Sequence, residues 1–217
     1  MRIKLVISFF CLVSLFSVYG AFGAGTINDT RHNLSVSGTG DIKSPTETRV
    51  CIFCHSSHNA STEGPLWNHK TASQKTFQTY QRSTMYSRPE QPNGSTKLCL
   101  SCHDGTIAVG AVHNRASVIP MNNVGSSGEI PATRESHIGT DLSGTHPVSV
   151  KFDQQVALSS SHLKWPISNL SESAMVDYNG FVQCTSCHDP HDDSKSVKYP
   201  FWRASTFSEV CKACHEF

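Results

Sequence analysis

Hydrophobic residues are concentrated at the N-terminus of the chain and are sparse after it. Arg2 and Lys4 precede a long apolar run, and small residues follow around positions 21–24. This order is typical of a secretory signal peptide. We predict a signal peptide over residues 1–23 and a single domain over residues 24–217. An uncleaved anchor is the alternative, although the run is short for one, and no other segment is long and apolar enough to span a membrane.

Beyond this leader, helical and strand periodicities are hard to find. Stretches rich in Ser, Thr, Asn, Gly and Pro, such as 87–97 and 122–136, separate short apolar groups. Residues 72–84 are compatible with a helix, although they lack a clean apolar face, and PVSVKF (147–152) alternates like a strand. We predict mostly coil with a few short helices and minimal strand. Side chains alone would hardly offset the conformational entropy of such a chain, so another component must fill its core.

Charge excludes one class of partner. The chain has 18 basic and 17 acidic residues, and loss of the leader changes the balance to 16 against 17. The mature protein is therefore near neutral. Its basic residues are scattered, without a stripe that would bind nucleic acid. We expect no nucleic-acid partner.

The cysteines are far more informative than the charge. Of nine, Cys11 lies in the leader, and the other eight form four C-x-x-C pairs, each followed by histidine. Motifs 1 to 4 are CIFCH, CLSCH, CTSCH and CKACH. C-x-x-C-H is the attachment signature of c-type haem. In one helical turn the two cysteines project from the same side and reach the two vinyl groups of the porphyrin, and the histidine binds the iron.

A single such motif is compatible with a redox dithiol or half a zinc site, whereas four that use every remaining cysteine favour four covalent haem c groups. The predicted attachment residues are Cys51, Cys54, Cys99, Cys102, Cys184, Cys187, Cys211 and Cys214, and the predicted proximal iron ligands are His55, His103, His188 and His215. Four haems would also supply the missing core. At about one haem per 50 residues, neighbouring porphyrins should stack or touch. We therefore predict a multihaem cytochrome c wrapped around a stacked row of four haems, with electron transfer along that row.

The sixth ligand of each iron decides between a carrier and an enzyme. Eight further histidines are available: His32, His58, His69, His113, His137, His146, His162 and His191. Met85, Met121 and Met175 are alternatives, but a methionine ligand raises the reduction potential, and histidines exceed the need. We predict bis-histidine ligation at all four irons. Closed irons have no vacancy for a substrate, so we expect no enzyme activity.

Two of these histidines follow a motif histidine by three residues, His58 in CHSSH and His191 in CHDPH. On a helix, residues three apart share a face. The sixth ligand must arrive from the opposite side of the porphyrin, so neither can bind the iron of its own motif. Each can bind a different iron, and a solvated loop residue is the alternative.

The remaining histidines differ in context. Pro147 holds His146 extended, which suits a ligand. His32 is equally compatible with a ligand and a surface residue. The others fit propionate partners or surface residues better: His69, His113, His137 and His162.

Several segments resemble a known family: RHNLS, CIFCHSSHNA followed by GPLWN, CLSCHDGT, GTDLSGTHPVSV and CTSCHDPH. They are similar to secreted multihaem c-type cytochromes of metal-respiring bacteria, and most similar to the tetrahaem subunits of extracellular cytochrome filaments. The resemblance implies bis-histidine haems, little regular secondary structure and a haem stack that continues from subunit to subunit.

The resemblance also implies specific ligands. Matching segments give His32, His58, His146 and His191 as distal ligands, with His58 binding a haem of the adjacent subunit in a homopolymer. They further suggest His32 on the haem of motif 1 and His146 on that of motif 2. His191 and a neighbour's His58 would then serve the last two motifs.

Three functions remain open. The first is a filament subunit, exported to the cell surface or beyond, that conducts electrons to external acceptors. The second is a monomeric periplasmic shuttle, in which His58 serves a haem of its own chain. The third is a multihaem reductase with one five-coordinate iron, which should show a departure from the motif rule, yet all four motifs end in histidine.

Overall fold

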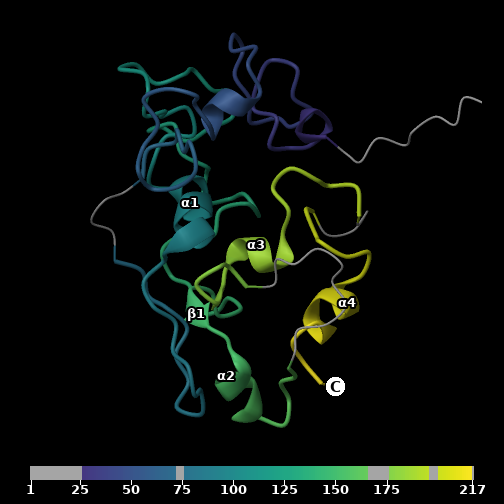
Figure 1. Ribbon diagram of the computed structural model, residues 1–217. Helices are drawn as coiled ribbons and strands as arrows, with labels where there is room; N and C mark the ends of the chain where they lie inside the picture. Colours follow the sequence, from purple (N-terminus) through teal and green to yellow (C-terminus); the bar gives the residue numbers. More distant parts are fainter. Residues whose placement is uncertain (1–25, 72–75, 166–175, 196–199, 217) are drawn as a thin grey trace, which may run out of the picture.

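The computed structural model describes residues 26–71, 76–165, 176–195 and 200–216, so the predicted signal peptide (1–23) and Met175 lie outside it. The described elements are η1 (Ile27–Asp29), η2 (Cys51–Phe53), α1 (Gly94–His103), β1 (Val150–Lys151), α2 (Gln154–Leu158), β2 (Phe181–Val182), α3 (Cys184–Cys187) and α4 (Phe207–Lys212). Figure 1 shows how much of the chain between them is irregular. This confirms the predicted fold of mostly coil with a few short helices and minimal strand. Within the described ranges, no helix combines the length and the hydrophobicity needed to cross a membrane.

Each cysteine motif starts on a short helix. η2 carries the start of motif 1, α1 contains motif 2, α3 contains both cysteines of motif 3, and α4 ends at Lys212 within motif 4. The sequence starts α4 with a capping box: Thr206 Oγ1 accepts a hydrogen bond from the Glu209 amide, and Glu209 Oε2 accepts one from the Thr206 amide. Such reciprocal bonds satisfy the free amides of a first turn. A four-residue α3 is supported by the corresponding pair, Gln183 and Ser186.

The motif helices lie in a row. In Figure 1 the short helix of motif 1 lies above α1, and α3 and α4 follow towards the lower right. Polar contacts hold α1 against α3: the Cys184 amide donates to Thr96 Oγ1 (3.2 Å), and the hydroxyls of Ser95 and Thr185 are 2.6 Å apart. Motifs far apart in sequence are therefore neighbours in space.

Two small apolar clusters contribute to the core among the described side chains. The first consists of Ile52, Phe53, Val112 and Ile119, and Cys54 packs against it. The second consists of Val150, Phe152, Ala157 and Val182, and Cys214 packs against it. Each cluster thus borders on a motif cysteine. Four-residue clusters are small for a chain of this length, as expected if the motifs hold further apolar groups.

The predicted strand 147–152 is present in shortened form. β1 pairs antiparallel with β2, with Val150 opposite Val182 and Lys151 opposite Phe181. Ser149, just before β1, is fully buried and has a φ of 53°. A left-handed residue interrupts the pleat, so the alternation in the sequence extends further than the strand.

The predicted helix over 72–84 is wrong for its described part, 76–84. Gln78 lies in an extended segment, where its amide donates to the Thr140 carbonyl (3.0 Å) and its carbonyl accepts from the Leu142 amide (2.7 Å). A helix needs an apolar face to bury, which this segment lacks. The short helix α2 was not predicted from the sequence; Asp153 caps its first turn by accepting a hydrogen bond from the Val156 amide (3.0 Å).

The side chain of Gln183 connects the segments that precede α1, β2 and β1. Its side chain is almost fully buried, donates to Asn93 Oδ1 (2.7 Å) and Asp177 Oδ2 (2.9 Å), and accepts from Ser149 Oγ (3.3 Å). These partners precede α1, β2 and β1 respectively. One amide therefore connects three segments around α3.

We expect Gln183→Ala to lower the free energy of unfolding by about 2 kcal/mol, because it leaves buried partners without their hydrogen bonds. Denaturant titration followed by circular dichroism measures the change. Ser194→Ala, at an exposed position, is the control. A loss as small for Gln183→Ala as for the control would contradict a joining role.

Candidate haem sites

The eight motif cysteines are free thiols, and the surroundings of six of them oppose ionisation. None of them forms a disulfide. Burial raises the pKa of Cys54, Cys102 and Cys187 to about 12 and that of Cys214 to about 11. Redox dithiols and zinc ligands act as thiolates and lie in surroundings that lower this pKa. Sites that favour uncharged sulfur fit thioethers, the form that cysteine takes when haem c is attached.

Thiols of different motifs lie close together. Cys99 donates a hydrogen bond to Cys184, which lowers the pKa of Cys184 to about 7 and raises that of Cys99. Cys54 and Cys102 interact electrostatically, and so do Cys187 and Cys214. The four motifs therefore follow one another in space in the order of the sequence, with sulfur atoms near each junction.

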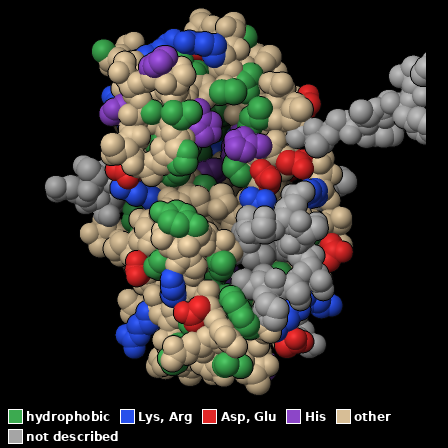
Figure 2. Space-filling model, in the orientation of Figure 1, with side chains coloured by type: hydrophobic (Ala, Val, Ile, Leu, Met, Phe, Trp, Pro, Cys, Tyr) green, Lys and Arg blue, Asp and Glu red, His purple; other side chains and the backbone are tan. Residues whose placement is uncertain are grey.

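Three of the four motif histidines face a second imidazole. The ring centroids are 6.1 Å apart for His55 and His191, 6.1 Å for His32 and His103, and 6.2 Å for His146 and His215. Every pair joins one motif histidine to one histidine outside the motifs. Figure 2 shows histidine side chains gathered in the upper half of one face of the molecule.

This spacing fits an iron between two imidazoles. With metal–nitrogen bonds of about 2 Å and about 1.1 Å from each nitrogen to its ring centre, the two centres are about 6.2 Å apart. In the described part of the chain, no three His, Cys, Asp or Glu side chains converge to hold a bare metal ion. Two are enough for a haem, because the porphyrin supplies the other four ligands. The residues present therefore fit haem c.

Hydrogen bonds prepare several of these rings for metal binding. Nδ1 donates to a backbone carbonyl in His32 (Pro190, 3.1 Å), His103 (Ser136, 2.7 Å), His146 (Pro147, 3.0 Å) and His188 (Pro200, 3.2 Å). A carbonyl only accepts, so Nδ1 carries the proton and Nε2 keeps its lone pair for a metal. Burial lowers the pKa of His32 to about 4 and lowers that of His103, which keeps both rings neutral.

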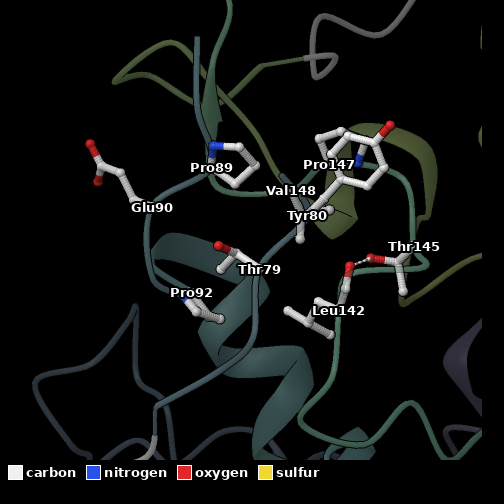
Figure 3. A pocket seen from close by; sticks show the side chains of 9 residues that line it. All are labelled: Thr79, Tyr80, Pro89, Glu90, Pro92, Leu142, Thr145, Pro147 and Val148. Carbon is white, nitrogen blue, oxygen red and sulfur yellow. Dashed lines mark hydrogen bonds between the residues drawn. The ribbon is translucent and has the colours of Figure 1, made fainter. Parts of the chain in front are cut away.

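A shallow hollow supports the loop of His146. Figure 3 shows Pro89 and Pro92 on one side and Leu142 and Thr145 on the other, with the Tyr80 ring beside Pro147. Pro147 and Val148, the residues after His146, also line it. Rigid proline rings on both sides restrict this loop, which fits the extended ligand expected from the His-Pro sequence.

The pairs differ from those that the resemblance implied. His32 lies against motif 2 rather than motif 1, His146 against motif 4 rather than motif 2, and His191 against motif 1. His191 also does not share a helical face with His188, although the spacing of three residues suggested that it would. The backbone at His188 is extended (φ −114°, ψ 138°) and not helical, so His191 leaves its own motif by a turn of the chain.

The other histidines are distributed between structure and surface. His69 is almost fully buried, with its ring nitrogens at the carbonyls of Lys70 (2.8 Å) and Ala108 (3.2 Å). His137 packs on Gly105, where an added Cβ would lie 2.1 Å from the imidazole. His113, His162 and His58 are exposed. Among the described residues, no side chain forms a hydrogen bond or ring contact with the His58 ring.

Sequence reasoning missed two tryptophans. Trp67 and Trp202 each form an isolated β-bridge with a motif histidine, His55 and His188 respectively. The residues before them have left-handed backbones: Leu66 has a φ of 53° and Phe201 of 60°. The signal was present as a repeat, because CHSSH is followed by Pro-Leu-Trp and CHDPH by Pro-Phe-Trp.

The comparison with known families concerns motifs 3 and 4. The family model of the doubled CXXCH motif matches residues 179–217, which contain motifs 3 and 4. No curated protein matches the chain. The doubled motif indicates covalent haem c binding and electron transport, as in multihaem c-type cytochromes.

The geometry gives a test of ligand pairing. We expect His191→Ala to convert one ferric haem from low spin to high spin, because its iron loses one imidazole. In protein that already lacks motif 1 through Cys51→Ala and Cys54→Ala, the same substitution should change nothing further. Absorption and electron paramagnetic resonance (EPR) spectra measure both. A high-spin haem that appears on His191→Ala in the protein lacking motif 1 would contradict the pairing of His191 with His55.

Proposed function

We propose that this protein is a tetrahaem electron carrier with two imidazoles on every iron, and that it polymerises through His58. The observation that carries the proposal is that one motif histidine lacks a second imidazole and one other histidine ring lacks a partner. His188 has no second imidazole among the described residues, although the other three motif histidines do. His58 has an exposed ring without a partner in the part of the chain that the structure describes.

The internal repeat, with residues 54–67 as the first repeat and 187–202 as the second, supports the direction of this link. Within one chain, His191 of the second repeat meets His55 of the first repeat at a ring separation of 6.1 Å. If the same relation continues between molecules, His58 of the first repeat meets His188 of the second repeat in the next copy. Such a head-to-tail contact uses two different surfaces, and it generates an open filament when its rotation does not close.

An exposed apolar residue lies beside His58. Leu66 is 57% exposed, whereas Phe201, at the equivalent place in the second repeat, is 8% exposed. The Ser56 amide donates to the Leu66 carbonyl (2.9 Å), which keeps Leu66 on the loop of His58. An apolar side chain held at a strained φ without cover is consistent with burial against a partner.

The described residues would set up conduction by placing the motifs side by side. Haem c, once attached, supplies a site that gains or loses one electron. The contact between Cys99 and Cys184 and the proximity of Cys54 to Cys102 and of Cys187 to Cys214 would hold neighbouring groups close. With His58 on the next copy, the row would continue through a filament. The leader and the family resemblance favour export, with acceptors at or beyond the cell surface.

One observation favours a second candidate. In a monomer, the iron at His188 would keep an open face, as a reductase requires. This candidate, a multihaem reductase, differs from the first because the protein should then bind cyanide or carbon monoxide at one haem. A carrier with all four irons closed binds neither.

We expect His58→Ala to abolish filaments and to leave one ferric haem of each subunit without its second imidazole. Negative-stain imaging and gel filtration report assembly, and EPR reports ligation. His113→Ala, which removes another exposed histidine, is the matched control and should assemble as the wild type does.

The outcomes separate the candidates. A wild type that is monomeric and entirely low spin, and that loses one low-spin haem on His58→Ala, would identify a monomeric shuttle and contradict the filament. Normal filaments from His58→Ala protein would contradict the bridging role of His58.

We expect Leu66→Ser to raise the protein concentration needed for assembly about tenfold, because burial of a leucine contributes roughly 1.5–3 kcal/mol. Monomer spectra should not change, since Leu66 is not a ligand. Leu158→Ser, at a position 77% exposed on α2, is the control. Sedimentation across a concentration series measures the threshold. An equal threshold for Leu66→Ser and the control would show that Leu66 is not part of the interface.

A further inference from the structure

The chain returns to motif 3 after the CHDPH sequence. Residues 200–203 lie antiparallel to residues 187–189: the Asp189 amide donates to the Phe201 carbonyl (2.7 Å), and the Arg203 amide donates to the Cys187 carbonyl (3.0 Å). Arg203 anchors the returning segment further. Its Nε donates to the Thr185 carbonyl (2.6 Å), and its guanidinium lies 3.4 Å from Asp189.

Two consecutive aromatic residues of this segment stack on histidines at two different haem sites. Phe201 lies parallel to His32, with ring centroids 4.2 Å apart and planes at 17°. Trp202 lies parallel to His188, with centroids 4.8 Å apart and planes at 18°. His32 faces the motif 2 histidine and His188 is the motif 3 histidine, so the dipeptide contacts two haem sites.

Two proline carbonyls also fix the protonation of these rings at Nδ1. The Pro190 carbonyl accepts from Nδ1 of His32 (3.1 Å), and the Pro200 carbonyl accepts from Nδ1 of His188 (3.2 Å). Each imidazole therefore has one aromatic ring stacked on it and donates one hydrogen bond to a proline carbonyl. Together they restrict both the tilt of the ring and its rotation about the axis towards the metal.

The backbone at Phe201 is strained for this arrangement. Its φ is 60°, a region that costs a bulky residue free energy, and yet its side chain is buried. The Phe201 amide is held by Asp193 Oδ1 (2.6 Å). Strain that neighbouring contacts maintain at a candidate site motivates a functional explanation.

We propose that Phe201 and Trp202 are positioning residues that orient the axial imidazoles of two neighbouring haems, His32 at motif 2 and His188 at motif 3. The proposal rests on the haem ligation proposed above, and because the second imidazole at motif 3 comes from His58 of the next copy, it is tested on assembled protein. Stacking sets the angle between the two imidazole planes on an iron, which is 64° for His32 and His103. It also excludes water from the imidazole, and less water beside a ligand raises the reduction potential.

The alternative is that the two rings only fill apolar space. Leucine or alanine would then change stability and nothing else. Orientation has a different readout, because the EPR g-values of a low-spin ferric haem depend on the angle between its two imidazole planes. The test therefore compares spectra of holoprotein that contains its full complement of haem.

Phe201→Leu keeps apolar volume but removes the stacked plane, and Trp202→Phe keeps a stacked plane. We expect Phe201→Leu to shift the g-values of one haem and to lower the potential of one of four reduction steps. Trp202→Leu should shift a different haem, and Trp202→Phe should restore the wild-type spectrum. A double leucine variant should show both shifts together. Tyr178→Leu, at an aromatic position 98% exposed, is the control.

The possible failures are distinguishable. Wild-type protein without four attached haems would overturn the proposed function itself. Four haems in the wild type, with leucine variants that retain all four and match the control in g-values and potentials, would overturn the positioning role. Shifts of the same haem by both single leucine variants would also overturn it, because each aromatic residue must act on its own imidazole. If Phe201→Leu protein loses haem, Phe201→Tyr replaces it and must retain the wild-type spectrum.

Discussion

In the proposed carrier, the rest of the structure depends on one constraint: two imidazoles must face each other across the space of an iron. Three ring pairs at 6.1 to 6.2 Å satisfy it. One member of each pair is next to its cysteines, while the other comes from far along the chain, as with His32 and His103. The irregular segments between them are the connections that this convergence needs. Because the constraint acts on positions of single side chains, it favours loops of suitable length over long helices or wide sheets.

The scarcity of apolar residues follows from the same constraint. The two described clusters are small, and each borders on a motif cysteine, Cys54 or Cys214. Burial around these sulfurs disfavours charge, and burial around His32 and His103 keeps their rings neutral. Sites that favour neutral sulfur and neutral imidazole fit covalent haem c. The apolar surface of the cofactor would then take the place of a side-chain core.

The sequence predicted haem attachment better than it predicted which histidines pair with which motif. The motif spacing was sufficient for haem c, for a helix at each motif and for a fold dominated by coil, because these depend on residues close together in the chain. Pairing depends on how long segments return, and the family resemblance implied different partners for His32 and His146 from those in the structure. The helix expected over 72–84 failed because strand-like contacts with residues 140–142 satisfied that backbone instead. Trp67 and Trp202 could have been found, since Pro-Leu-Trp and Pro-Phe-Trp follow the two CHxxH sequences.

The repeat gives the unpaired residues a common explanation. His191 and His55 show how one repeat meets the other inside the chain, and His58 and His188 are the residues left for the same contact between chains. Near-infrared magnetic circular dichroism, which identifies the axial ligands of ferric haems, tests this most directly when recorded on dissociated and assembled protein. We expect three bis-histidine haems per subunit after dissociation and four in the filament. Four bis-histidine haems in the dissociated subunit would contradict the link through His58.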